Sequence, residues 1–390
     1  MREYFEFYLP TKILAGFSAL DNLGFELNIL NIKKPLIVSD HVIEKVGVSG
    51  IVKNVLEQNG ICFSEFLDVP LESSLETVEE IAEFFNKEKC DCLIAVGGGS
   101  VIDSAKGVRI LLEYPNKKMI ELSGADNLNT KFTTPLVVVP TTSGTGSEAT
   151  LVAVIKDTQN HVKLPFLSYG MLPDLAILDP RSTISLPAKM TAATAMDALV
   201  HAIEAYIGTQ KNPVSDSFAA SAINLISKNV LLAIENPKDN VSRLNLAIAS
   251  MLAGAAFSNS MVGIVHAIGH SVGAVCEVPH GVSMSILLLP CLEYYKSVSN
   301  NYLGELLLYL TDTEYFASTK DKTNASLDFI RNLLNTLNQK AQLPLHLKDV
   351  CKDKSELGKI AELSINDGAI TFSPFFADKK IVLEILEKAW

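Results

Sequence analysis

The sequence has 390 residues, of which 48% are hydrophobic, so it holds enough apolar material for one large core or two medium ones. Lysine and arginine total 33 against 44 aspartates and glutamates, a formal charge of −11. This balance gives no electrostatic support for a nucleic-acid or anionic-membrane partner. The bulk numbers predict a globular protein with two domains, no nucleic-acid partner and no membrane partner.

The N-terminus, MREYFEFYLPTKILAG, carries early charges and no uninterrupted apolar run, so we expect neither a signal peptide nor a transit peptide. Six cysteines are scattered along the chain, which is typical of reduced thiols in a cytoplasmic protein.

Between Leu244 and Val275 no Asp, Glu, Lys or Arg occurs, and this segment is long enough to span a bilayer. Because this segment contains histidines and several Ser and Gly residues, helices buried in a soluble core explain it better.

Residues 1–183 alternate short apolar runs with helical patterns, as βαβ units do. The expected strands are 35–40, 61–69, 91–96, 133–140 and 172–180, and the expected helices are 48–60 and 74–90. Buried strands that alternate with helices predict a parallel, doubly wound sheet.

Residues 184–390 have a different pattern, in which long helical periodicities replace the strands. The clearest are 191–207, 213–233, 241–260 and 323–338. We therefore predict an α/β N-terminal domain with a parallel sheet (1–183) and an all-α C-terminal domain (184–390), with the hinge in 180–187.

One carboxylate and several imidazoles lie in two otherwise apolar, small-residue segments of the second half. Asp197 and His201 are four residues apart in an alanine-rich helical pattern, so both side chains project from one face. His266 and His270 repeat this spacing, and a following turn can swing His280 back toward them. Such groups are costly to bury on apolar helices unless a cation pairs them, so the set predicts a metal site.

Neutral imidazoles and a carboxylate are borderline-to-hard ligands, which favours Fe²⁺ or Zn²⁺ over copper or a thiolate cluster. An open coordination position would make the ion a Lewis acid. Each histidine taken alone is better explained as a buried side chain bonded to a carbonyl. Four of the seven histidines, however, lie between positions 201 and 280, so for the group as a whole we favour a metal site.

The run Gly-Gly-Gly-Ser at 97–100 lies between an expected strand and a helical pattern. Glycines permit close backbone approach, and the N-terminus of the following helix offers N–H groups to a pyrophosphate. The spacing is not the common dinucleotide fingerprint, so a simple tight turn also explains it. Asp40, at the end of an earlier strand, suits either a ribose-hydroxyl acceptor or an ordinary helix N-cap.

Five segments occur in a fixed order along the chain: GGGS (97–100), PTTSGTGSE (140–148), MDALVHAIEAY (196–206), GIVHAIGHSVGAV (263–275) and PHG (279–281). Together they resemble the iron-containing alcohol dehydrogenase family, the group III metal-dependent alcohol dehydrogenases. The likeness is collinear over nearly the whole chain, and the combination is far more specific than any of its parts.

The resemblance implies a dinucleotide-binding N-terminal domain, a helical C-terminal domain and a metal in the cleft between them. It implies reversible hydride transfer between NAD and a primary alcohol or small diol. The implied ligands of Fe²⁺, or alternatively Zn²⁺, are Asp197, His201, His266 and His280. His270 is similar to the residue near the nicotinamide that is credited with proton relay.

The resemblance also implies a set of NAD contacts. The implied residues are Gly97, Gly98, Gly99 and Ser100 at the pyrophosphate, Thr141 and Thr142 in the cofactor cleft, Lys163 at the nicotinamide-side ribose and Asp40 at the position associated with NAD preference. A carboxylate there would repel the 2′-phosphate of NADP. The family likeness further implies a cytoplasmic homodimer or larger homo-oligomer that acts on a small alcohol or aldehyde.

Some positions depart from the family's usual residues, although none is a metal ligand. Residues 71–73, Leu-Glu-Ser, stand where Asn-Pro-Thr is common on the adenine side. Val275 and Cys276 replace bulkier residues, and if they line the pocket they would admit longer or branched alcohols. Packing in the core is the other explanation, and we favour it for Val275.

Two other functions remain as alternatives. A lyase of the dehydroquinate synthase type shares the two-domain plan and uses NAD and a metal, but the chain lacks a cluster of Lys and Arg near the motifs of the cleft. A non-catalytic metal-binding or assembly protein would have no use for an intact glycine turn together with Lys163.

Overall fold

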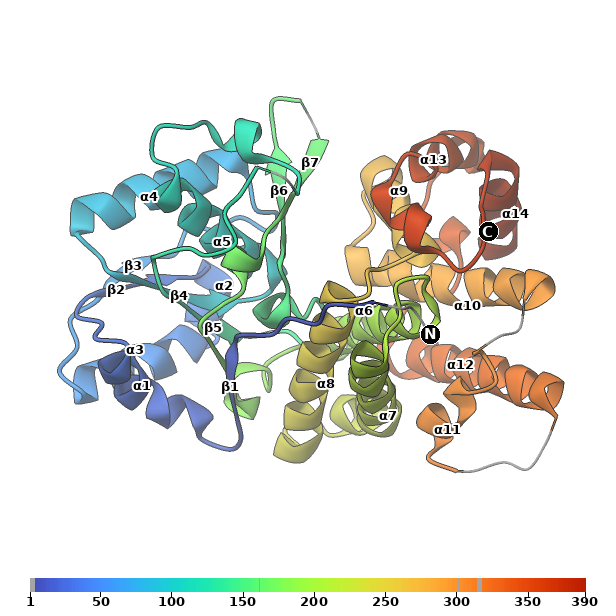
Figure 1. Ribbon diagram of the computed structural model, residues 1–390. Coiled ribbons are helices and arrows are strands. Elements are labelled where there is room, and N and C mark those ends of the chain that lie inside the picture. Colours follow the sequence, from blue (N-terminus) through green and yellow to red (C-terminus); the bar gives the residue numbers. More distant parts are fainter. Residues whose placement is uncertain (1–3, 126, 161, 300–301, 314–317) are drawn as a thin grey trace. The chain divides into compact units, whose positions relative to one another are not determined.

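Figure 1 shows the computed structural model of the chain, which describes residues 4–125, 127–160, 162–299, 302–313 and 318–390. The chain forms an α/β unit, Tyr8–Leu186, and a helical unit that consists of Pro187–Trp390 and the described residues 4–7. Where we predicted a boundary between 183 and 184, the chain passes from one unit to the other between Leu186 and Pro187.

In the described part of the α/β unit, six parallel strands form a sheet in the order β1-β8-β5-β4-β2-β3. They are β1 (Lys12–Ala15), β2 (Pro35–Val38), β3 (Ser64–Phe66), β4 (Cys92–Gly97), β5 (Leu136–Pro140) and β8 (Leu175–Leu178). The strands β2, β4, β5 and β8 are buried at every position. Burial on both faces explains their continuous apolar sequences, and the predicted parallel sheet is confirmed.

Helices cover both faces of this sheet. They are α1 (Leu23–Ile29), α2 (His41–Lys45), α3 (Val48–Gln58), α4 (Leu75–Glu88) and α5 (Gly99–Glu113). Alternate residues of β4 point to opposite faces, so that Ile94 and Val96 pack with α1 and α3, whereas Leu93 and Ala95 pack with α4 and α5. The sheet is thereby fixed in register, and its carboxyl edge is presented at the end of β4.

Several elements of this unit were not predicted from the sequence. They are the first strand, β1, the helices α1 and α2, and an antiparallel hairpin of β6 (Val152–Asp157) and β7 (Val162–Leu167), which pairs Lys156 with Lys163.

Nine α-helices, three short 3-10 helices and no strand occur in the described part of Pro187–Trp390, so the predicted all-α domain is confirmed. The α-helices are α6 (Ala188–Ile207), α7 (Pro213–Glu235), α8 (Asn240–Ser258), α9 (Ile264–Cys276), α10 (His280–Val298), α11 (Leu306–Thr311), α12 (Thr319–Ala341), α13 (Leu357–Ser364) and α14 (Lys379–Ala389). One correction concerns His280, which we placed in a turn and which is the first residue of α10.

Helices α7 and α8 are long and apolar enough to cross a membrane, judged by length and composition alone. Both contribute side chains to the one large core of the helical unit, where they pack against each other and against α6. The charge-free stretch that begins at Leu244 therefore runs through the interior of this unit.

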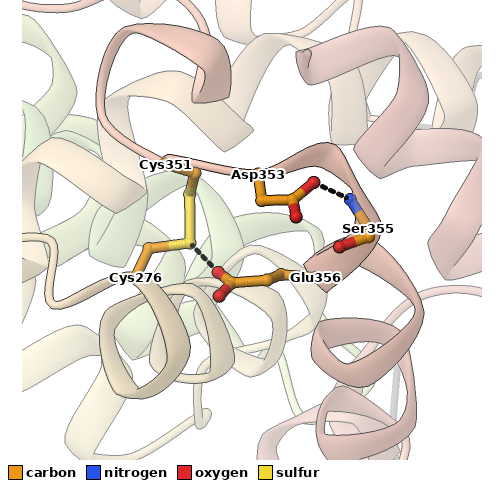
Figure 2. Close-up of a disulfide and its surroundings, with 5 residues drawn as sticks. All are labelled: Cys276, Cys351, Asp353, Ser355 and Glu356. Carbon is orange, nitrogen blue, oxygen red and sulfur yellow. Dashed lines mark hydrogen bonds between the residues drawn. A yellow bond between two sulfur atoms is a disulfide. The ribbon is translucent and has the colours of Figure 1, made fainter.

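Cys276 and Cys351 form a disulfide, with Cα atoms 5.2 Å apart (Figure 2). The expectation that all cysteines are reduced is wrong for this pair, because the fold brings the end of α9 against a residue 75 positions later. Among the described residues, Cys62, Cys90, Cys92 and Cys291 are free.

Two helical glycines of the α/β unit form a matched pair for testing its packing. A methyl group on Gly107 of α5 would lie 2.6 Å from Ile155 and 2.9 Å from Val78, whereas one on Gly50 of α3 meets no described atom within 4 Å. We expect Gly107→Ala to lower the free energy of unfolding by about 1–3 kcal/mol through overpacking. Gly50→Ala should raise it by about 0.5–1 kcal/mol, because alanine suits a helix better. Denaturant titration of both variants measures these changes, and a neutral Gly107→Ala would contradict the packing described.

Candidate functional site

Helix α6 carries the first two site residues. Asp197 and His201 are buried and lie one turn apart on the face that meets the interior of the helical unit. The ring of Phe257 in α8 stacks on His201, with centroids 4.3 Å apart. The alanine-rich sequence of α6 permits this close packing, because small side chains let neighbouring helices approach.

Helices α9 and α10 bring two further histidines to α6. His266 of α9 stacks on His201 with centroids 4.5 Å apart, and His280 of α10 places Nε2 3.2 Å from Asp197 Oδ1. Gly281 explains the approach of α10, because a methyl group there would lie 2.5 Å from the carbonyl oxygen of Ala193 in α6. One ligand atom from each of the four predicted metal ligands lies within 4.8 Å of the others.

Several of these atoms have the character of metal ligands. Within the described part of the chain, His201 Nδ1 and His266 Nε2 are buried without a hydrogen-bond partner, and Asp197 Oδ1 is buried with only His280 Nε2 nearby, at 3.2 Å. Leaving such atoms unpaired is costly, and a cation among them would remove that cost. The four residues therefore fit a divalent ion with carboxylate and imidazole ligands.

The protonation states of these groups also suit a metal. Burial lowers the pKa of His201 to about 3, and it lowers the pKa of His266 well below its usual value. Burial alone would raise the pKa of Asp197, but the neighbouring His201 and His280 more than reverse this and hold it well below its usual range. His201 and His266 are thus neutral imidazoles beside an ionised carboxylate, the forms that bind metals.

Glu204, one turn after His201 on α6, is a buried site residue that the sequence analysis missed. Its Oε2 lies 2.6 Å from His266 Nδ1, and its Oε1 accepts the backbone N–H of Val265 at 2.7 Å. When Nδ1 donates to Glu204, Nε2 of His266 keeps the lone pair that a metal needs. Burial raises the pKa of Glu204, and the N–H groups at the start of α9 oppose that rise.

His270 lies one turn beyond His266 on α9 and is partly exposed, with 44% of its side chain accessible. Its Nδ1 is 2.8 Å from Asp367 Oδ2, so this carboxylate fixes the ring and leaves Nε2 for other partners. Burial would raise the pKa of Asp367, but the hydrogen bond from His270 lowers it overall. The rings of His270 and His280 stack with centroids 5.4 Å apart, which places His270 beside the four ligands.

The predicted glycine turn lies at the carboxyl end of β4, where Gly98 is the N-cap of α5 and Gly99 its first residue. A methyl group on Gly98 would lie 3.3 Å from Thr142, and one on Gly99 would lie 2.9 Å from Thr145. The turn therefore packs closely against the loop after β5. It leaves the N–H groups of a fifteen-residue helix at the sheet edge, an arrangement that suits an anionic group.

The other predicted NAD contacts of this region are also placed around the turn. The backbone N–H of Thr141 donates to Gly97 O at 3.0 Å, while its hydroxyl is buried without a partner among the described residues. The hydroxyl of Ser100 donates to the carbonyl of Leu71. Ser100 is thus used to hold the loop after β3, which carries the unusual residues 71–73.

Asp40 is the N-cap of α2, and its Oδ1 accepts the backbone N–H groups of Val42 and Ile43 at 2.8 and 2.9 Å. The helix-cap explanation of this residue is thus realised in the structure. Capping uses one carboxylate oxygen and leaves the negative charge at the carboxyl end of β2, so a role toward a ribose stays a prediction.

Lys163 of β7 is half-exposed, and its Nζ lies 2.7 Å from Glu72 Oε1. The other oxygen of Glu72 accepts from Lys156 Nζ at 2.8 Å. Hydrogen bonds from these two lysines hold the pKa of Glu72 at about 2. The lysine predicted to contact the cofactor is therefore paired with one of the residues at which this chain departs from its family.

A buried lysine was also missed in the sequence analysis. Lys106 of α5 is fully buried and donates to Ser147 Oγ, Thr150 O and Val152 O at 2.8–2.9 Å. Burial lowers the pKa of Lys106 to about 8. These bonds anchor the chain between β5 and β6, together with the first residue of β6, to α5.

Comparisons with known proteins agree with this geometry. Residues 10–180 match the family described as "Iron-containing alcohol dehydrogenase", and residues 191–390 match "Fe-containing alcohol dehydrogenase family, C-terminal". The chain belongs to the iron-containing alcohol dehydrogenase family. It is accordingly an oxidoreductase of the alcohol dehydrogenase type, and because both halves match, nothing in these comparisons favours the lyase alternative.

Among its relatives is the 1,3-propanediol dehydrogenase of Citrobacter freundii, 33% identical over 99% of both chains. Another is the NADPH-dependent butanol dehydrogenase of Clostridium saccharobutylicum, 32% identical over 98% of this chain and 97% of that one. The solved structure of the alcohol dehydrogenase from Oenococcus oeni superposes with a TM-score of 0.94 at 30% identity and covers 99% of this chain and all of that one.

A variant of Glu204 tests its role as a positioning residue for His266. In Glu204→Gln one amide position accepts a hydrogen bond and the other donates, so the side chain cannot accept from both His266 and Val265. We expect the affinity for Zn²⁺, measured by competition with a chromophoric chelator, to fall about 10–100-fold.

Glu305→Gln is the matched control, because Glu305 also accepts a hydrogen bond from α6, at Tyr206, and touches none of the four ligands. It should bind Zn²⁺ as the unmodified chain does. A Glu204→Gln variant that also retains its metal would contradict the positioning role.

Proposed function

We propose that this protein is a metal-dependent, NAD-linked alcohol dehydrogenase that transfers hydride reversibly between NAD(H) and a primary alcohol or small diol and its aldehyde. The observation that carries the proposal is the buried group of four ligand atoms within 4.8 Å of one another. The relative named for 1,3-propanediol supports the small diol as a substrate class.

Asp197, His201, His266 and His280 would hold Fe²⁺ or Zn²⁺ through one carboxylate oxygen and three ring nitrogens. Bound there, the ion would supply Lewis acidity toward the alcohol oxygen. The chain itself contributes a water-poor setting, because three of the four residues are buried and Phe257 covers one face of His201. Charges interact more strongly in such surroundings than in water.

His270 would receive the proton that the alcohol releases. Asp367 binds its Nδ1, so Nε2 is the nitrogen available for proton exchange, and the partial exposure of the ring gives a route to solvent. Oriented by a carboxylate in this way, the imidazole can take up a proton without losing its position.

In the α/β unit, Gly97, Gly98 and Gly99 would bind the pyrophosphate of NAD at the start of α5. Thr141 and Thr142 would line the cofactor site, and Lys163 would leave Glu72 to contact a ribose hydroxyl. Asp40 supports NAD over NADP, because its charge would repel a 2′-phosphate. An NADPH-dependent relative exists, so this preference rests on Asp40 itself and on no property common to the family.

The family likeness further supports a cytoplasmic enzyme that forms a homodimer or larger homo-oligomer. The net charge of −11 supports an enzyme with no nucleic-acid or membrane partner.

A spectrophotometric assay tests the proposed reaction. After loading with Fe²⁺ or Zn²⁺, the unmodified protein should form NADH from primary alcohols, and chelation should abolish this activity. His280→Ala should lose bound metal and turnover together. His270→Ala should retain the metal, lower kcat by about 10²-fold and change the pH dependence, because it removes a proton acceptor but no ligand.

His346→Ala, at an exposed histidine of the same unit, is the control and should match the unmodified protein. Full metal occupancy in His280→Ala would refute the ligand assignment. Tight NAD binding and bound metal without net NADH formation would refute the dehydrogenase reaction.

Cofactor preference is tested at Asp40. Asparagine preserves the cap of α2, because its side-chain oxygen can still accept from Val42 and Ile43, and it removes the charge. We expect Asp40→Asn to raise the ratio of kcat/KM with NADP to that with NAD about tenfold, the effect of about 1.4 kcal/mol.

Asp68→Asn is the matched control, because Asp68 forms an isolated bridge with Asp40 and pairs with His41. If the ratio of kcat/KM with NADP to that with NAD rises equally in both variants, the cause is a general effect of surface charge. If this ratio does not rise in Asp40→Asn, the residue does not face the 2′ position.

A further inference from the structure

The disulfide Cys276–Cys351 connects two segments that both contribute to the candidate metal centre. Cys276 is the last residue of α9, the helix that carries His266 and His270. Cys351 follows the short helix Leu347–Asp349 and leads toward α13, which packs against α9. Beyond α13 the chain reaches Asp367, the partner of His270. The segment is therefore fastened to α9 covalently at one point and by a hydrogen bond at another.

The bond also lies close to a predicted metal ligand along the chain. Only residues 277–279 separate Cys276 from His280, and Glu277 adopts a left-handed conformation with φ 56° that ends α9. A covalent restraint on Cys276 thus limits the motion of the turn from which α10 and His280 begin. Loosening this restraint would affect the ligand at the start of α10 more than those on α6.

The environment of the pair permits both oxidation states. Cys276 is partly exposed and Cys351 is buried, so Cys276 is the more accessible residue of the pair. Glu356 Oε2 lies 3.5 Å from Cys276 Sγ (Figure 2). In the reduced state the Cys276 thiol can donate a hydrogen bond to this carboxylate, which gives the dithiol form a partner in place of the S–S bond.

We propose that Cys276 and Cys351 form a reversible redox switch that controls how firmly the chain holds its metal. In the oxidised state the bond fixes the end of α9 and the turn before His280. In the reduced state the turn and the segment from Cys351 to Asp367 are released from each other, and the metal leaves faster. This inference rests on the metal site of the proposed function.

The chemistry is thiol–disulfide exchange with an external dithiol. A thiolate of the dithiol attacks Cys276 Sγ, the S–S bond breaks, and Cys351 leaves as a thiolate that takes up a proton. The second thiol of the reductant then attacks the mixed disulfide, releases Cys276 as a thiol and leaves the reductant as a disulfide. Two electrons pass to the protein, and the reverse exchange restores the bond.

The test uses the full chain loaded with Zn²⁺, so that the metal itself undergoes no redox change. One portion is oxidised with glutathione disulfide, and another is reduced with a phosphine that is then removed. Alkylation followed by mass spectrometry reports which cysteines are free, and transfer of Zn²⁺ to a chromophoric chelator reports the rate of metal release. We expect Cys276 and Cys351 to be protected only in the oxidised sample, and release to be about tenfold faster in the reduced sample.

Serine variants show whether the change in Zn²⁺ release comes from Cys276 and Cys351 or from another cysteine. Cys276→Ser and Cys351→Ser should each release Zn²⁺ at the fast rate under both conditions. Cys62→Ser, which removes an exposed free cysteine, should keep the difference shown by the unmodified protein. If one serine variant does not fold, the two preparations of the unmodified protein still decide the question.

Equal release rates in oxidised and reduced protein would overturn the switch, and so would free Cys276 and Cys351 after oxidation. Neither the alkylation pattern nor the rate of Zn²⁺ release depends on alcohol oxidation. A protein without the proposed dehydrogenase activity could therefore still show the redox switch. Protein that binds no Zn²⁺ would instead refute the metal site on which both proposals depend.

Discussion

The structure of the helical unit depends on the burial of one carboxylate and several imidazoles that would be costly to leave unpaired. Asp197, His201 and His266 are buried among apolar helices, and in the described structure the ligand nitrogens of the two histidines have no hydrogen-bond partner. A divalent cation among these atoms removes this cost. The helices that carry the ligands must therefore lie close enough for all the ligand atoms to reach one ion. Alanines on α6 and Gly281 on α10 let the helices approach closely enough for the four ligands to meet.

Residues beyond the ligands keep the centre ordered. Glu204 lies where it would hold His266 in the metal-binding tautomer, and it also accepts a backbone N–H at the start of α9. Asp367 orients His270 in a similar way. A carboxylate behind an imidazole fixes the ring and increases its basicity, so these two acids connect the packing of α9 to the chemistry proposed for it.

The α/β unit depends on a different constraint. At the carboxyl edge of its parallel sheet, the backbone of the glycine turn must lie very close to the loop after β5. Gly98 and Gly99 contact the loop after β5 so closely that side chains would meet Thr142 and Thr145. Lys106 stabilises that loop from inside the unit. The open N-terminus of α5 is thus a consequence of tight packing around the turn.

Much of this arrangement could be predicted because it follows periodic patterns. The buried strands appear as continuous apolar runs, and the paired spacings of Asp197 with His201 and of His266 with His270 place each pair on one helical face. The hairpin of β6 and β7 was missed because its strands are partly exposed and carry Lys163 and Pro165, which weaken a strand pattern.

Other features depend on contacts between distant residues and leave no local signal. Glu204 could have been found as the second acid of an otherwise apolar helical pattern, three residues after His201. Asp367 has no such pattern, because its contact with His270 joins residues 97 positions apart. The pairing of Cys276 with Cys351 could not be selected from six scattered cysteines, since the spacing of cysteines alone does not determine their connectivity.

The central claim is that Asp197, His201, His266 and His280 together bind one metal ion. Anomalous X-ray diffraction from crystals of the iron-loaded protein, collected above and below the iron absorption edge, tests it most directly. We expect one strong edge-dependent peak in contact with all four side chains. A stoichiometric metal peak at any other position, or none at these residues in protein that retains its iron, would contradict it.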